Sequence, residues 1–166
     1  MARTSLKDVP WNEVTSHGRL WTDTSRDAHG KGELKMGELM SFSEIQRRYQ
    51  NKENPFDLTI EKWIRIRQFA YTASTLSDYR ALFQAANVAV PFCVEYQRKN
   101  CLGCPLEKIC GPGKGEKLLK VMKLIQTQRL AILAGNRFSK ASLPSEIDGL
   151  LMELEMLKAK SIGGSE

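Results

Sequence analysis

Apolar side chains recur at every third or fourth position in the first half of the chain, which is the period of an α-helix that buries one face. The first such stretch opens at Ser41, with a glutamate three positions later as in a capping box, and is expected to end near Asn51. A second helix is predicted over residues 59–73, with Lys62 on its polar side. A third is predicted to begin after Thr75.

The second half of the chain carries two further helical patterns. One covers residues 116–134 and ends before Gly135, a residue type that often terminates helices. The other covers residues 145–160, with leucines at heptad-like spacing and acidic residues opposite. It is too short to persist alone, so we expect it to pack on the rest of the protein or on a partner. The predicted buried positions of the first pattern are Leu118, Val121, Met122, Ile125, Leu130 and Leu133.

These elements predict a mainly α fold class: a small helical domain with an irregular N-terminal arm and a C-terminal amphipathic helix. The arm, residues 1–40, shows no sustained helical or strand period and holds two tryptophans, so it is expected to dock on the body of the protein or on a partner. Pro91 predicts that extended chain leads into Cys93. The helical domain is expected at 41–140 and the C-terminal helix at 145–160.

Composition favours a protein that remains inside the cell. Of 166 residues, 42% are hydrophobic, which is enough for a packed core. No apolar run approaches the length of a membrane span, and the N-terminus lacks the apolar segment of a signal peptide. We therefore expect no membrane association, and a cytoplasmic, nucleoid or nuclear location rather than secretion. A reducing compartment keeps cysteines as thiols that are available to a metal.

Positive charge is concentrated in one part of the chain. The net charge is +6, and residues 93–140 hold ten Lys and Arg against three Asp and Glu, whereas residues 141–166 hold two against five. Such a concentration suits contact with nucleic-acid phosphate, although some of these cations could simply balance an anionic metal site. The candidate phosphate contacts are Arg98, Lys99, Lys108, Lys114, Lys117, Lys120 and Lys123.

All four cysteines fall within residues 93–110, at the spacing C-x7-C-x2-C-x5-C. These four cysteines, the candidate ligands of one metal centre, are Cys93, Cys101, Cys104 and Cys110. Four soft thiolates converging on one point are the ligand set of a tetrahedral metal ion or of an iron-sulfur cluster. The two-residue gap in CLGC lets both sulfurs reach one centre, and its glycine permits the tight turn. A site closed by four protein ligands is typical of a structural metal, because no position is left for substrate.

The last three cysteines, together with the CPL sequence that begins at Cys104, resemble the iron-sulfur loop of endonuclease III-type DNA glycosylases. That loop has the spacing C-x6-C-x2-C-x5-C, so the first gap here is one residue longer. In that family the loop holds a [4Fe-4S] cluster and presents basic side chains to the DNA backbone. The resemblance implies this role for Arg98, Lys99 and Lys108. It covers residues 93–110 only and does not extend to the family's catalytic domain.

Two metal centres and three functions follow from these observations. Zn(II) is slightly favoured over [4Fe-4S], because closed four-cysteine zinc sites are frequent in small intracellular domains. The leading function is a non-catalytic, metal-stabilised nucleic-acid-binding component of a DNA- or RNA-processing assembly. The first alternative is a protein-interaction adaptor that uses the N-terminal arm or the C-terminal helix. The second is an iron-sulfur DNA-processing enzyme or a redox sensor.

Overall fold

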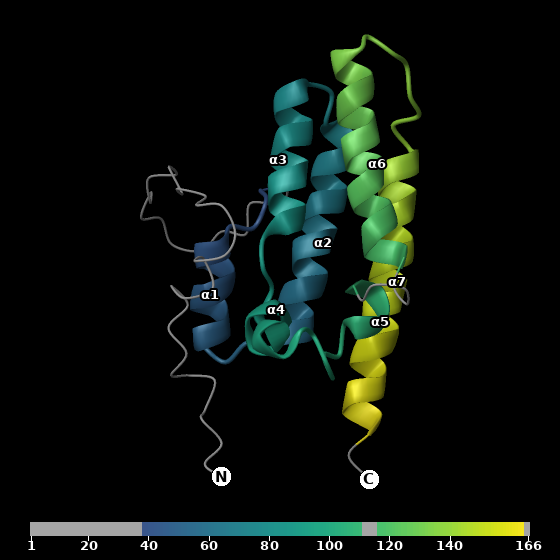
Figure 1. Ribbon diagram of the computed structural model, residues 1–166. Coiled ribbons are helices and arrows are strands. Elements are labelled where there is room, and N and C mark those ends of the chain that lie inside the picture. Colours follow the sequence, from purple (N-terminus) through teal and green to yellow (C-terminus); the bar gives the residue numbers. More distant parts are fainter. Residues whose placement is uncertain (1–37, 111–115, 165–166) are drawn as a thin grey trace. The chain divides into compact units, whose positions relative to one another are not determined.

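A computed structural model describes residues 38–110 and 116–164 of the protein. The described residues are mainly helical and contain no β-strand, which confirms the predicted fold class at that level (Figure 1). Most of the arm predicted at 1–40 lies outside them. The helices are α1 (Phe42–Gln50), α2 (Pro55–Thr72), α3 (Leu76–Asn87), α4 (Pro91–Tyr96), the 3₁₀ turn η3 (Gln97–Lys99), α5 (Glu107–Cys110), α6 (Glu116–Leu133) and α7 (Ser142–Gly163).

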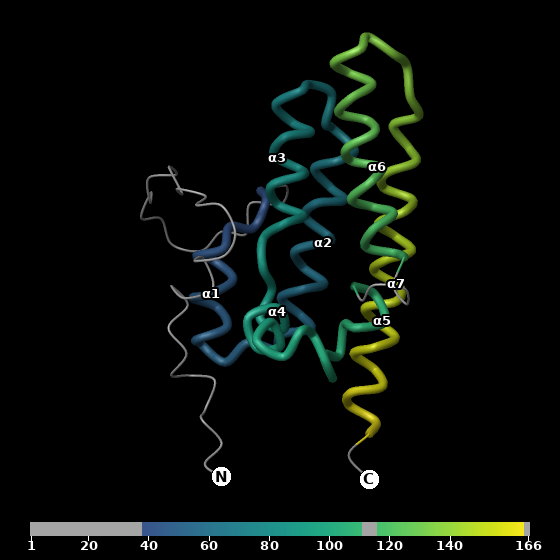
Figure 2. The backbone as a smooth tube through the Cα atoms, in the orientation of Figure 1, coloured from purple at the N-terminus to yellow at the C-terminus, as the bar shows by residue number. Residues whose placement is uncertain are grey.

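Four of the longer helices pack on one another: α2 on α7, α3 on α6, and α6 on α7 (Figure 2). They enclose a core of aliphatic side chains, each of which contributes about 1.5–3 kcal/mol by burial. Two ion pairs, Arg67 with Asp148 and Lys158 with Asp57, add links between α2 and α7. The short helices α4 and α5 pack on α2 and α6 respectively. The side chains with almost no exposed surface include Ile66, Leu82, Val121, Ile125, Ile147, Leu150 and Leu154.

Two predicted helix starts are confirmed by their caps. The Ser41 hydroxyl accepts a hydrogen bond from the backbone N–H of Glu44 at 3.1 Å. Thr75 and Asp78 form a complete capping box at the start of α3, in which each side chain accepts from the other residue's backbone N–H. These bonds satisfy N–H groups that have no partner inside the helix.

Two predictions were wrong at segments that contain a proline: the start of the second helix and the extended chain before Cys93. Helix α2 begins at Pro55, four residues before the predicted start, because Asn54 caps it and proline is well tolerated in a first turn. Pro91 likewise opens α4, so Cys93 lies in a helix and not in extended chain. Val90 does have the extended backbone that a following proline favours, but it serves as the helix cap.

The buried side of α6 also differs from the prediction. Val121 and Ile125 are buried as expected, whereas Leu130 and Leu133 are 62% and 59% exposed. Gln128 takes a buried place instead, because its amide nitrogen donates to the Ser139 carbonyl at 3.1 Å and to the Ser142 hydroxyl at 2.9 Å. A polar side chain can be buried where it supplies hydrogen bonds to the loop that leads into α7.

The C-terminal helix is longer than the predicted 145–160. Helix α7 extends from Ser142 to Gly163 and accommodates Pro144 in its first turn, where the missing N–H has no helical partner to lose. Its leucine stripe faces α2 and α6. The prediction that this helix packs on the rest of the protein is therefore confirmed.

Candidate metal centre and the basic residues around it

The four cysteines come from three short elements near one another. Cys93 lies in α4, Cys101 and Cys104 lie in the turn after η3, and Cys110 ends α5. All four fall within the described residues and carry free thiols. Burial, followed by the negative charge of the other three sulfurs, raises the pKa of the Cys110 thiol to about 12. The four sulfurs are therefore close enough to act on one another electrostatically, as four thiols at one site would.

The turn that carries Cys101 and Cys104 has an unusual backbone. Asn100, Cys101 and Gly103 all have left-handed conformations, with φ of 51°, 63° and 75°. A left-handed backbone at a residue with a Cβ costs about 1–2 kcal/mol, so the surrounding contacts must hold Cys101 there. The N–H of Cys104 donates to the Cys101 carbonyl at 3.1 Å, which closes the turn. Gly103 permits this turn, as the sequence predicted.

Cys104 also receives a backbone hydrogen bond at its sulfur. The N–H of Leu106 lies 3.4 Å from the Cys104 Sγ. This bond lowers the pKa of the Cys104 thiol, while burial, the larger influence, raises it. A backbone N–H directed at sulfur favours the charged thiolate, which is the form that binds a metal.

Cys93 and Cys110 share a cavity of about 370 Å³ with a buried lysine. Lys62 of α2 is only 4% exposed, so the prediction that it lies on the polar side of its helix was wrong. Its Nζ donates to the carbonyls of Ala86 and Val88, at 2.9 and 2.6 Å, and lies 5.2 Å from the centre of the Trp63 ring. The rest of the cavity lining is mostly apolar and includes Val90, Leu106, Ile109, Leu118, Leu150 and Leu154.

Burial and the cysteines act on Lys62 in opposite directions. Loss of water lowers the pKa of its ammonium group, and negative charge at Cys93 and Cys110 raises it by a smaller amount. The net result is a pKa of about 8. Within the described ranges no carboxylate pairs with this lysine. Sequence reasoning missed Lys62 because a lysine between apolar positions of a helix ordinarily faces solvent. Only the packing of α3 and α4 around it reveals its place.

The thiols are not already arranged around a single ion. In the part of the chain that the structure describes, no three Cys, His, Asp or Glu side chains have the geometry to hold one metal ion. The donor chemistry fits a metal centre nonetheless, since Cys93 and Cys110 line one cavity with a buried cation and the Cys104 sulfur receives a backbone N–H.

The predicted basic residues fall into two groups. Arg98 and Lys99 of η3 and Lys108 of α5 are exposed and flank the cysteine turn. Lys120 and Lys123 are exposed on α6, about one turn apart. All five of these side chains are therefore accessible to solvent.

The remaining two predicted lysines differ from these. Lys117 is half-buried, and its Nζ lies 3.2 Å from the point where a Cβ on Gly149 would stand, so its side chain reaches towards α7. Lys120, one of the five exposed cations above, makes an ion pair with Glu116 at 3.8 Å, in an exposed place where such a pair contributes little. Lys114 lies outside the described residues.

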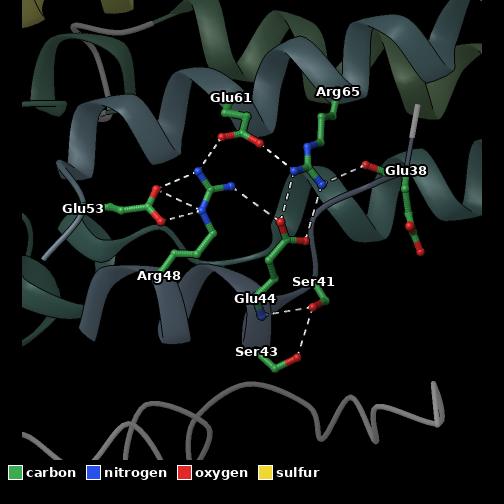
Figure 3. Close-up of polar contacts among 8 residues, drawn as sticks. All are labelled: Glu38, Ser41, Ser43, Glu44, Arg48, Glu53, Glu61 and Arg65. Atoms are coloured by element: carbon green, nitrogen blue, oxygen red, sulfur yellow. Dashed lines mark hydrogen bonds and ion pairs between the residues drawn. The ribbon is translucent and has the colours of Figure 1, made fainter. Parts of the chain in front are cut away.

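A separate cluster of charges joins α1 to α2, and the sequence did not predict it. Arg48 bridges Glu53 and Glu61 at 2.6 and 2.7 Å, while Arg65 bridges Glu44 and Glu61 at 3.1 and 2.5 Å (Figure 3). Hydrogen bonds from the two arginines, with Arg48 the stronger influence, lower the pKa of Glu61. Every charge in the cluster has an opposite partner, so its role is structural: it holds α1 on α2.

Comparison of the chain with protein-family models, with curated proteins and with solved structures found no match. None of the described helices combines the length and apolar character that crossing a bilayer requires.

Proposed function

We propose that the protein is a metal-stabilised, non-catalytic nucleic-acid-binding component of a DNA- or RNA-processing assembly. The observation that supports this most is that Cys93 and Cys110 line one cavity although they lie in different helices, while a closed backbone turn holds Cys101 and Cys104 together between them in the chain. Cys93, Cys101, Cys104 and Cys110 would hold one metal centre. The metal would then fix the positions of η3 and α5, which carry basic residues on either side of the cysteine turn.

Both Zn(II) and [4Fe-4S] suit four thiolates. Sulfurs around a single zinc ion lie about 3.8 Å apart, from Zn–S bonds of about 2.3 Å in a tetrahedron. A [4Fe-4S] cluster holds its thiolates further apart, because the irons and sulfides stand between them. Because the thiols in the described residues are not already grouped around one ion, they would have to move to bind zinc, whereas a cluster needs a wider arrangement.

The basic residues support phosphate binding rather than base recognition. Lysine and arginine side chains that contact phosphate release counterions, so their binding weakens steeply with salt and varies little with sequence. Arg98, Lys99 and Lys108 provide three such side chains beside the cysteine turn, all of them exposed.

Metal analysis of protein purified without oxygen tests the first half of the proposal. A broad absorption near about 400 nm with about four irons per chain would identify the cluster, and a colourless protein with one zinc would identify the ion. Cys101→Ser should reduce the bound metal in either case. A chain that takes up neither zinc nor an iron-sulfur cluster would contradict the proposal.

Binding to a labelled DNA duplex and to a labelled RNA tests the second half. The double variant Lys99→Glu with Lys108→Glu should bind more weakly, with a shallower salt dependence, since each lost phosphate contact reduces the slope of log K against log salt by about 0.9. Arg137→Glu with Lys140→Glu is the matched control, because both residues are exposed in the loop after α6 and the change in net charge is the same. Equal loss in both variants would indicate net charge alone, and no loss would exclude this surface.

A second candidate, a protein-interaction adaptor, is favoured by exposed apolar side chains on α7. Met152 and Met156 are 68% and 49% exposed and lie on one face of that helix, four residues apart. An adaptor of this kind would lose assembly with its partner in Met152→Glu with Met156→Glu, while its metal content and nucleic-acid binding stay unchanged.

A further inference from the structure

We infer that Lys62 is the internal counter-ion of the four-cysteine centre, an inference that rests on the metal site proposed above. Lys62 is the lysine on α2 whose side chain lines the same cavity as Cys93 and Cys110. Its role would be to balance part of the negative charge of the loaded site from inside the protein.

The environment of Lys62 supplies hydrogen bonds but no negative ion. Two of the three N–H groups on its Nζ are taken by the carbonyls of Ala86 and Val88, at the C-terminal end of α3, where the helix dipole favours a cation. No carboxylate in the described residues pairs with it, although it is 4% exposed. A buried charge without a counter-ion is costly, so its presence here calls for a negative partner.

The charge of the proposed centre matches this need. Four thiolates around a 2+ ion, or around a cluster core of the same charge, carry a net charge of about −2. Two of the four proposed ligands, Cys93 and Cys110, line the cavity that Lys62 also lines. The negative charge of the site and the positive charge of the lysine would therefore each reduce the free-energy cost of burying the other.

The exposed cations near the turn do not replace Lys62. Arg98, Lys99 and Lys108 lie at the surface, where water and salt screen their charge. Lys62 acts across a mostly apolar cavity, where the effective dielectric constant is lower and a charge acts more strongly. Loss of this one cation should therefore weaken metal binding more than loss of a surface lysine.

The inference predicts different effects of Lys62→Met in the two forms of the protein. Methionine has similar length and no charge, so it fits an apolar cavity. In the metal-free chain the variant removes a buried charge but also leaves the Ala86 and Val88 carbonyls without their donor, so its unfolding temperature should fall less than that of the loaded chain. In the loaded chain it removes the counter-ion. The variant should therefore bind the metal about tenfold more weakly than the wild type does, as measured by competition with a chelator.

The experiment loads full-length wild type, Lys62→Met and the surface control Lys140→Met with the metal found by analysis, and titrates each with a chelator of known affinity. If the centre is an iron-sulfur cluster, its reduction potential provides a second measurement: a tenfold effect for one electron equals about 59 mV, and the variant's potential should be lower because a nearby positive charge is gone. Lys140→Met should behave as the wild type in both measurements.

Several outcomes would overturn the inference. One is a loaded Lys62→Met chain that retains its metal as the wild type does. Another is an equal loss of stability with and without metal, since that result indicates a packing role only. If Lys62→Met does not fold, Lys62→Gln keeps an N–H donor for the α3 carbonyls and is judged by the same measurements. A wild-type chain that takes up no metal overturns the proposed function, and this inference with it.

Discussion

At the scale of single residues, the cysteine turn combines three left-handed conformations within four consecutive positions, at Asn100, Cys101 and Gly103. Asn100 and Cys101 both have positive φ although each carries a Cβ. Asparagine tolerates this left-handed region better than most residues, whereas cysteine does not favour it, so the conformation of Cys101 is strained. Such strain persists only where other interactions hold it, and it is common at ligand-binding sites. A metal bound by Cys101 would supply one such interaction.

Gly103→Ala is expected to destabilise the cysteine turn. The site has open space for a methyl group, so the cost of about 1–2 kcal/mol arises from the positive φ of 75° alone. The thermal unfolding temperature should fall by a few degrees, and the protein should retain its metal less well. Gly163→Ala is the control: it also has open space but lies at the end of α7 without a positive φ, and alanine there should be neutral or slightly stabilising. Equal effects of the two changes would exclude backbone strain as the cause.

At the scale of elements, two kinds of contact hold the helices together. The long helices share an apolar core, whereas α1 is joined to α2 largely through the arginine and glutamate cluster. The buried residue of α1 is Ile45, which packs with Met40 and Leu58 in a small separate cluster. With so little apolar surface of its own, α1 depends on ion pairs that α7 does not need.

Stability should depend on Glu61 in a pH-dependent way. Because Arg48 and Arg65 lower its pKa below 4.5 in the folded protein, Glu61 contributes stability above about pH 4.5, and that contribution is lost as the pH falls through the lowered value. Glu61→Gln should cost about 1–2 kcal/mol of unfolding free energy at pH 7 and progressively less under acid conditions. Urea unfolding from pH 7 to pH 3 measures the difference.

The control for Glu61 is Glu146→Gln, at an exposed position of α7 without an ion pair among the described residues. Its unfolding free energy should follow the wild type at every pH. A Glu61→Gln deficit that stays constant from pH 7 to pH 3 would show that the lost stability does not come from the charge.

Helix α7 should depend on its buried leucines. Leu150 has no exposed surface and lies in the main core, so Leu150→Ala is expected to cost about 2–5 kcal/mol through lost burial and the cavity left behind. Met152 is 68% exposed on the same helix, and Met152→Ala should change the unfolding free energy by less than about 0.5 kcal/mol. Denaturant unfolding of both variants checks this; similar values would mean that α7 does not pack as described.

At the scale of the molecule, stability is expected to be uneven. The long helices α2, α6 and α7 share most of the buried aliphatic side chains. The region 91–110 consists of two short helices, a 3₁₀ turn and a strained turn. Short helices are not stable by themselves, so this region depends on its few packing contacts and on whatever its cysteines bind.

Removal of the metal should therefore loosen one region and leave the rest folded. Amide hydrogen exchange across residues 91–110 is expected to speed up markedly in the metal-free protein, while the central amides of α2 and α7 keep their protection. Far-ultraviolet circular dichroism should change little, because the long helices remain. A uniform rise in exchange over the whole chain would indicate that the metal supports the entire fold, and no change would indicate that no metal stabilises this loop.

Much of the fold could be predicted because its signals are local. The caps at Ser41 and Thr75 and the glycine of the CLGC turn depend on neighbours within a few residues, and each was found where expected. The errors in predicted helix boundaries came at prolines, because the same residue can have two effects on a helix. Proline breaks a helix or begins one, and at Pro55 and Pro91 it begins one.

The sequence by itself determined the helical class, the starts of α1 and α3 and the clustering of four cysteines, because periodicity, caps and spacing are properties of short segments. Only the tertiary structure decided which side of each helix is buried. It left Leu130 and Leu133 exposed, buried Gln128, and placed Lys62 in one cavity with Cys93 and Cys110. These outcomes depend on residues far apart in the chain, since burial is set by whichever helix or loop packs against a position, and no local pattern carries that information.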